Sequence, residues 1–162
     1  MKIYIASDHA GFELKKALVD HLKVKSHEVE DMGAHVLDNN DDYPDFIYPC
    51  AFRVASFGDA QDKQGKPKAL GIVIGGSGQG EAIVANKVRG IRAAVYYGGN
   101  PAVAILSKEH NNANILSLGA RYLSQNEAIA AVDLWLEIQF SKEERHIRRV
   151  EKIKEIEENL KR

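Results

Sequence analysis

Glu81 directly follows a glycine-rich loop, and this pairing is the part of the sequence that most clearly suggests chemistry. The segment GIVIGGSGQGEAIVANK (71–87) runs from an apolar stretch through four glycines to this acid. Backbone N–H groups at the start of a helix can stabilise an oxyanion that develops during a reaction. A carboxylate beside them can remove the proton whose loss creates that anion. The pairing suits proton abstraction next to a carbonyl, giving an enediolate, although a tight turn with an acid favoured by the helix dipole remains an alternative.

Three familiar glycine motifs do not fit this loop. Gly75 and Gly80 have the spacing of a P-loop, but Glu81 stands where that motif needs lysine. A dinucleotide fingerprint would need its third glycine at position 81, and Gln79 replaces the last glycine of a nucleophile elbow. We therefore expect no nucleotide or other cofactor at the loop.

Other polar residues stand next to predicted strands and helices. Asp8 and His9 follow the first predicted strand, and Arg121 directly follows the fifth. His110 lies at the end of a predicted helix, next to Asn111. Histidine and aspartate can move protons between sugar oxygens. Taken singly, however, Asp8 fits a helix N-cap and His110 fits a helix C-terminus, where the dipole favours a cation.

Arg145 and Arg149 are four residues apart, so they share one face of a helix. Like charges at this spacing repel unless something neutralises them. Glu144 and Glu151 can do so on a solvated face. A phosphate group is the other candidate, because the guanidinium fork matches its oxygens.

The elements that must position these residues alternate along the chain. Strands are predicted at 2–7, 27–33, 69–75, 91–97 and 114–120, and helices at 11–23, after Pro44, and at 80–88, 100–110, 124–140 and about 141–161. This alternation predicts an α/β fold with a five-stranded parallel sheet and helices on both faces. Ligands bind at the carboxyl ends of the strands of such a sheet.

The composition predicts one domain over residues 1–162. With 162 residues, 44% hydrophobic residues and a net charge of −1, nothing in the composition predicts a general affinity for nucleic acid or membranes. No apolar run reaches the length of a membrane span, and the N-terminus is too short for a secretory signal, so a cytoplasmic protein is expected. Cys50 is the single cysteine, and we expect it to be buried in a helix rather than catalytic.

Two segments lie outside this chemistry. The polar stretch 58–69 is expected to be a surface insertion without a chemical role. The C-terminal helix carries apolar residues at spacings of three and four, namely Ile147, Val150, Ile153, Ile156 and Leu160. Packing on its own domain and packing on a partner chain both remain open for this stripe.

Five segments in one order resemble a known family. They are ASDHAGFELK, DYPDF, GGSGQGEAIVANKVRGIRAA, SKEHNNANILSLGAR and RHIRRVEKI. Together they resemble the ribose-5-phosphate isomerase B family, which also holds the galactose-6-phosphate isomerase subunits, from Lys2 to about Ile153. The resemblance implies a Rossmann-like three-layer α/β/α sandwich. It also implies a metal-free homodimer, or a dimer of such dimers, with the active site at the subunit interface.

The resemblance also implies a reaction and a role for each residue. The reaction is the interconversion of an aldose phosphate and a ketose phosphate through an enediolate. His110 and Asp8 would open the sugar ring, and Gly76, Ser77, Gly78 and Gly80 would form the anion hole. The phosphate would be held by His9, Arg121, Arg145 and Arg149, the subunit that supplies the last two being left open, and the sugar would be lined by Tyr43 and Asn111.

One departure concerns the base. Part of the family has a cysteine at the position of Gly75, whereas the other branch has a glutamate at the position of Glu81. We therefore expect Glu81 to be the base of an enzyme that interconverts ribose 5-phosphate and ribulose 5-phosphate. Two alternatives remain: a six-carbon sugar 6-phosphate of the allose or galactose type as substrate, or a non-catalytic sugar-phosphate-binding module.

Overall fold

The structure is a computed structural model that describes residues 1–58, 60, 65 and 67–160. Its centre is one five-stranded sheet in the order β2-β1-β3-β5-β4, in which every neighbouring pair is parallel. The strands are β1 (Lys2–Ser7), β2 (Glu28–Asp31), β3 (Ala69–Gly75), β4 (Ala93–Tyr96) and β5 (Ile115–Gly119). The predicted bounds of the first and third strands are confirmed, and the other three strands are shorter than predicted.

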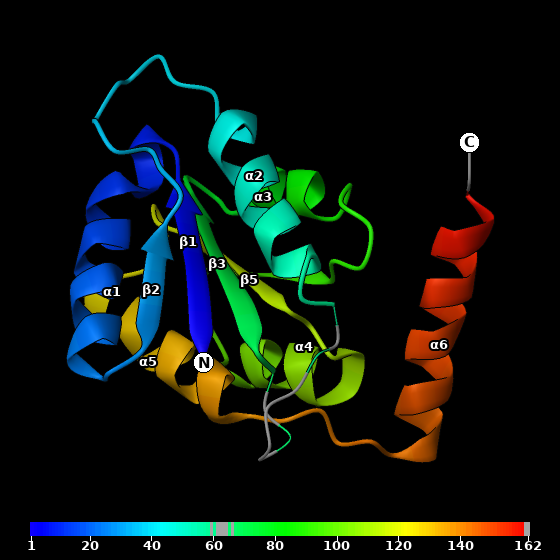
Figure 1. Cartoon of the computed structure of the whole chain (residues 1–162). Coiled ribbons are helices and arrows are strands. Elements are labelled where there is room, and N and C mark those ends of the chain that lie inside the picture. The colour runs from blue at the N-terminus through cyan, green and yellow to red at the C-terminus, as the bar shows by residue number, and fades with distance from the viewer. Residues whose placement is uncertain (59, 61–64, 66, 161–162) are drawn as a thin grey trace.

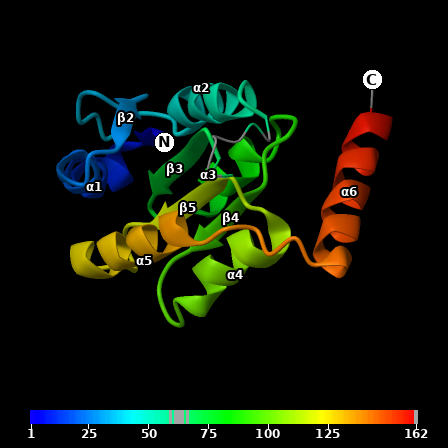
Figure 2. The same ribbon diagram turned by 60° about the horizontal axis from the view of Figure 1, so that its bottom comes forward.

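Helices cover both faces of the sheet and give three layers (Figure 2). They are α1 (Phe12–Val24), α2 (Pro44–Ala55), α3 (Gln79–Ala85), α4 (Ala102–Asn111), α5 (Gln125–Glu137) and α6 (Glu144–Asn159), and a short 3₁₀ turn (His9–Gly11) precedes α1. One apolar core joins the sheet to α1, α4 and α5, and a second core joins it to α2 and α3. The predicted Rossmann-like α/β/α sandwich is therefore confirmed.

The residues of β1 show why both faces are apolar. Ile3 and Ile5 are fully buried in the core with α1 and α5, whereas Tyr4 and Ala6 are fully buried in the core with α2. Side chains alternate between faces along a strand, so a strand covered on both sides needs an unbroken apolar run. This packing fixes the positions of the ends of the strands and of the residues that follow them.

Local signals also set the helix starts. Ser124 accepts a hydrogen bond from the backbone N–H of Glu127, and the Glu127 carboxylate accepts one from the Ser124 N–H, which is the capping box predicted for α5. Pro44 occupies the first turn of α2, and Pro49 lies inside that helix without ending it. Cys50 is buried in α2 as predicted, and burial raises the pKa of its thiol.

Helix α6 stands apart from the layers (Figures 1 and 2). Its first turn meets α4, where the rings of His146 and His110 lie 4.2 Å apart between centroids. Near its other end, Glu157 accepts a hydrogen bond of 2.8 Å from the Gly90 N–H. The apolar stripe between these contacts is largely open, with Ile153 49% and Ile156 61% exposed.

The predicted polar insertion at 58–69 lies mostly outside the described residues, since 59, 61–64 and 66 are not among them. Within the part of the chain that the structure describes, we find no helix long and apolar enough to cross a membrane.

Candidate active site

The carboxyl ends of β1, β3 and β5 gather the first group of candidate residues. Ser7 pairs with Ile74 in the sheet register, and Gly75 pairs with Gly119, so these three strands end side by side. The residues that follow are tied together by the backbone, because Arg121 N–H donates to the Gly76 carbonyl at 3.0 Å. Asp8 and His9, the glycine loop and Arg121 therefore meet at one edge of the sheet.

The glycine loop is held by a residue that the sequence analysis missed. Ser117 is fully buried in β5, and its Oγ donates a hydrogen bond of 2.6 Å to the carbonyl of Gly78. Gly78 has a φ of 76°, and an added Cβ there would come within 3.0 Å of the Leu118 backbone. A serine in an otherwise apolar strand was the available signal. Ser77, the predicted anion-hole residue, accepts a bond of 3.3 Å from the Gln79 N–H.

Glu81 lies in the first turn of α3 and is 4% exposed. Its carboxylate packs against the end of β3, because a Cβ added to Gly75 would fall on the carboxylate atoms. Burial raises the pKa of this carboxyl and the charge of Asp8 raises it further, while a backbone hydrogen bond opposes the shift. A raised pKa makes the carboxylate a stronger base, as general-base catalysis requires.

Tyr43 and Arg121 lie against the same loop. A Cβ added to Gly80 would come within 2.9 Å of the Tyr43 hydroxyl oxygen, and one added to Gly76 within 3.1 Å of the Arg121 guanidinium carbon. These two glycines therefore leave room for the phenol and the guanidinium. The arrangement puts a cation and a hydroxyl beside the loop N–H groups, which suits an anionic sugar.

Asp8 and His9 form the remaining part of this edge. Asp8 is 6% exposed and caps the following turn, accepting bonds of 3.0 Å from Ala10 N–H and 3.1 Å from Gly11 N–H. The ring Nδ1 of His9 lies 2.6 Å from Asp41 Oδ1. Asp41 is the second residue that the sequence analysis missed, because it stands in a polar stretch where nothing singles it out.

Asp8, His9 and Asp41 also form the one group among the described residues whose possible ligand atoms are close enough for a metal ion. These atoms all lie within 4.8 Å of one another. However, His9 Nδ1 is already bonded to Asp41, and Arg121 is near enough to His9 to oppose a further positive charge there. Both features count against a metal ion at this point.

The second group of predicted site residues lies elsewhere in the chain. His110 and Asn111 end α4, just before β5 begins, so they lie at the amino edge of the sheet. Four strand steps, roughly 13 Å, separate this edge from the end of β5. Arg145 and Arg149 are exposed on α6, the helix whose His146 packs on His110. A single chain therefore does not bring this group to Glu81.

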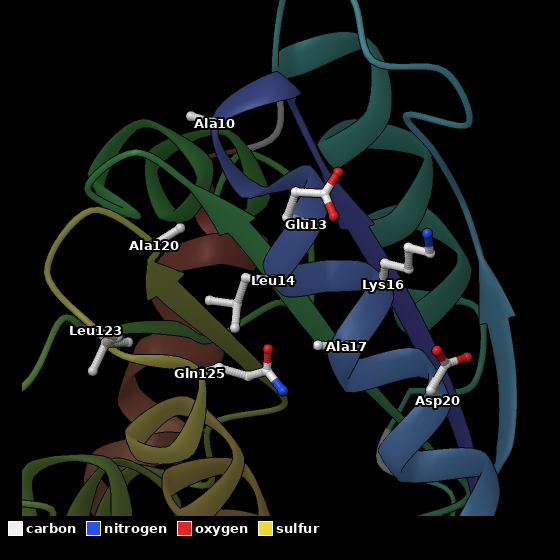
Figure 3. Close-up of a pocket in the computed structure, with 9 residues that line it drawn as sticks. All are labelled: Ala10, Glu13, Leu14, Lys16, Ala17, Asp20, Ala120, Leu123 and Gln125. Atoms are coloured by element: carbon white, nitrogen blue, oxygen red, sulfur yellow. The ribbon is translucent and has the colours of Figure 1, made fainter.

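A groove of about 600 Å³ opens between α1 and the start of α5 and is lined in part by Ala10 of the 3₁₀ turn (Figure 3). Ala10 and Ala120, the chain neighbours of His9 and Arg121, lie at one side of the groove. Its other side is lined by three residues of α1, namely Glu13, Lys16 and Asp20. No predicted site residue lines this groove. The candidate site therefore lies outside this groove.

Comparison with known proteins adds the relatives of this chain. The model of the Ribose/Galactose Isomerase family matches residues 3–153. The ribose-5-phosphate isomerase B of Mycobacterium tuberculosis is 42% identical over 157 residues, covering 97% of this chain and 90% of that protein.

Two solved structures are also similar. The Mycoplasma genitalium ribose-5-phosphate isomerase B with bound ribulose-5-phosphate is 41% identical, with a TM-score of 0.88, and the match covers 97% of this chain and 96% of that one. The Clostridium thermocellum ribose-5-phosphate isomerase B is 45% identical, with a TM-score of 0.84, over 98% and 99% of the two chains.

Proposed function

The chain belongs to the ribose/galactose isomerase family, and from that premise we propose that it interconverts ribose 5-phosphate and ribulose 5-phosphate. The related Mycoplasma genitalium enzyme holds ribulose 5-phosphate in its structure. In this chain, the observation that carries the proposal is the Glu81 carboxylate, which is buried against a loop of backbone N–H groups. We further propose that Glu81 is the base.

The arrangement supports an enediolate mechanism step by step. Glu81 removes the proton from C2 of the open-chain aldose, the electron pair forms the C1–C2 double bond, and the C1 carbonyl oxygen becomes an oxyanion. The loop N–H groups around Gly78, with Ser77, stabilise that charge. Glu81 then returns the proton to C1, while a proton moves from the C2 oxygen to the C1 oxygen, which leaves the ketose.

We also propose that each site uses two copies of the chain, in a homodimer. One copy supplies Glu81, His9, Tyr43 and Arg121 from the carboxyl edge, and the other supplies His110 for ring opening, Asn111 for the sugar, and Arg145 and Arg149 for the phosphate. The separation of the two groups within one chain supports this division. So do the exposed apolar side chains on α6 and on the face made by α2 and α3, which include Ile153, Ile156, Tyr48, Phe52 and Ile83.

Two other functions make different demands on the site. A six-carbon sugar 6-phosphate needs only a longer pocket, and the family includes galactose isomerases. The relatives named above are ribose-5-phosphate isomerases, which favours the five-carbon sugar. A non-catalytic binding module would have no use for a buried carboxylate whose charge is disfavoured, so Glu81 argues for catalysis.

We propose that the whole chain acts as one isomerase domain in the cytoplasm, without cofactor or metal. The chemistry of the site supports this, since a carboxylate, backbone N–H groups and cations suffice for the proton transfers described. A phosphorylated sugar carries charges that lipid bilayers exclude, so the enzyme must be in the same compartment as the sugar phosphate, which we propose is the cytoplasm.

Steady-state turnover of ribose 5-phosphate by EDTA-treated protein tests the proposal. The substitution Glu81→Gln should lower kcat by roughly 10²–10⁴-fold and leave KM nearly unchanged, because the amide cannot take the C2 proton. Glu13→Gln is the matched control, since Glu13 is an exposed acid in the first turn of α1. Normal turnover in the Glu81 variant would rule out Glu81 as the base. Turnover of allose 6-phosphate but not of ribose 5-phosphate would show that the substrate is the six-carbon sugar.

The acid limb of the pH profile gives a second reading in the same assay. The base must be ionised, so kcat/KM of the native enzyme should fall as the pH drops through the pKa of Glu81. Because burial raises that pKa, the fall should begin at a higher pH than an exposed glutamate would give.

A further inference from the structure

His9 is held by two hydrogen bonds to one carboxylate. Asp41 Oδ1 accepts from the His9 backbone N–H at 3.1 Å and lies 2.6 Å from the ring Nδ1. The Asp41 side chain is 8% exposed, and its second oxygen, Oδ2, is buried without a hydrogen-bond partner among the described residues. A buried carboxylate in this setting needs a cation beside it, and the imidazolium of His9 is the nearest candidate.

The bond at Nδ1 decides what the other ring nitrogen can do. If the ring is neutral, its single proton lies on Nδ1, facing Asp41, and Nε2 is a bare acceptor that repels a phosphate oxygen. If the ring is protonated, Nε2 also carries a hydrogen and can donate to phosphate. The charged form of His9 is therefore the only one that binds an anion through Nε2 while the Asp41 bond is kept.

The charges around His9 come from three parts of the chain. Asp41 enters from the segment before α2, Asp8 precedes His9, and Arg121 enters from the end of β5. The Asp41 hydrogen bond is the largest influence and raises the pKa of His9, Asp8 raises it further, and Arg121 lowers it. Glu81 lies near Asp8, whose charge raises the pKa of the Glu81 carboxyl.

We propose that Asp41 is a positioning residue for phosphate binding: its carboxylate orients the His9 ring and keeps it charged, so that Nε2 donates to the phosphate group of the substrate. This inference rests on the proposed phosphate role of His9. It adds to the site a residue that reaches the substrate only through another side chain.

The sign of the pH effect follows from the raised pKa of His9. With Asp41 in place, the imidazolium persists to higher pH than that of an ordinary histidine, whose pKa is about 6.5. Phosphate affinity is then lost only as the pH rises through the raised value. In Asp41→Asn, the amide oxygen can still accept from Nδ1, but the charge is gone, so the loss should occur at lower pH.

The test is direct binding of inorganic phosphate to the full chain by calorimetry at pH 6 and pH 8, with NMR titration of the His9 ring. Asp41→Asn should bind about as tightly as the native chain at pH 6. At pH 8 it should bind roughly tenfold more weakly, as expected when a hydrogen bond to a charged group is lost. The His9 pKa should fall in this variant. Because the assay measures phosphate binding, a failure of this inference can be distinguished from a failure of the proposed isomerase activity.

The control is another histidine–aspartate pair. Asp133→Asn removes the carboxylate that lies 2.9 Å from His21 Nε2, between α5 and α1, and should leave phosphate binding unchanged at both pH values. Asp41→Glu keeps the charge and should retain the native pH profile. An unchanged His9 pKa in Asp41→Asn, or an equal loss of affinity at pH 6 and pH 8, would overturn the proposal.

If Asp41→Asn does not fold, His9→Gln and Asp41→Glu still decide the question. His9→Gln should bind phosphate more weakly than the native chain at both pH 6 and pH 8, because the native imidazolium stays charged over this range and the glutamine carries no charge. Equal phosphate affinity of His9→Gln and the native chain at pH 8, or a native His9 that titrates like an ordinary histidine by NMR, would equally contradict the inference.

Discussion

Glu81 keeps its carboxylate in the space that a side chain at position 75 would occupy. The resemblance implies two alternative bases, a cysteine at position 75 or a glutamate at position 81, and in this chain the two side chains would compete for one space. The two positions share one volume at the end of β3. Gly75 thus leaves the space that the Glu81 carboxylate occupies, although it contributes no functional group of its own.

A double-mutant cycle tests this shared volume. Gly75→Ala should reduce kcat by at least tenfold and lower the melting temperature, because the new methyl group displaces the Glu81 carboxylate. The same substitution in a Glu81→Ala background should cost little stability, since its obstacle has been removed. Thermal melting and turnover measure both effects. Equal destabilisation in the two backgrounds would show that position 75 is crowded by something other than Glu81.

Residues near one another in the sequence were easier to assign than residues joined across the fold. Glu81 follows the glycine loop directly, and Asp8 and His9 follow a strand, so their place at the carboxyl edge was predictable. Asp41 meets His9 across 32 positions, and Ser117 meets Gly78 across 39. A contact of this kind depends on strand order, which the pattern of apolar residues leaves undetermined.

At the scale of elements, buried residues continue beyond the ends of helices and strands. The predicted helix 80–88 ends at Ala85 in the structure, yet Val88 is 7% exposed and belongs to the core. Likewise Ile91 is 6% exposed but lies in a turn, where its N–H donates to the Val88 carbonyl, before β4 begins. Apolar residues in turns extended the predicted elements, because an apolar pattern reports burial rather than backbone conformation.

The position of the glycine loop depends on β5 as much as on β3, and this yields a prediction. Ser117→Ala leaves the buried Gly78 carbonyl without its partner, at a cost of about 1–3 kcal/mol. The melting temperature should fall by several degrees, and kcat should fall as well, because Gly78 forms the turn before α3. Thermal melting and steady-state kinetics give the two values.

Ser107→Ala is the matched control for that change. Ser107 is also nearly buried, and its Oγ donates 2.7 Å to the Ala104 carbonyl in α4, away from the loop. It should lose stability to a similar degree but keep kcat. If both variants lose kcat alike, the loss in Ser117→Ala reflects general destabilisation and not the shape of the loop.

At the scale of the whole molecule, α6 is the helix whose packing partner could not be predicted from the sequence of one chain. Its apolar stripe was visible in the sequence, but the choice between its own domain and a partner was not. In the structure only His146 of this helix is buried, and Arg145 and Arg149 are exposed. The residues that would cover the stripe are not supplied by the described part of the same chain, so no pattern along the sequence could identify them.

Mixing of inactive chains tests the two-copy site. Glu81→Gln removes the base from one edge, and His110→Ala removes the ring-opening group from the other, so each variant alone should be nearly inactive. In a mixed dimer with two-fold symmetry, one site carries both substitutions and the other carries neither. Random reassociation of equal amounts makes half of the dimers mixed, each with one intact site.

The mixture should therefore regain about a quarter of the native turnover, measured after the chains are unfolded and refolded together. Separately refolded variants that are combined only in the assay are the control, and they should stay inactive while exchange is slow. If Glu81 and His110 act within one chain, no intact site forms in a mixed dimer and the activity stays at that of the variants. A return of activity would also assign α6 its role, because Arg145 and Arg149 accompany His110 into the site of the other copy.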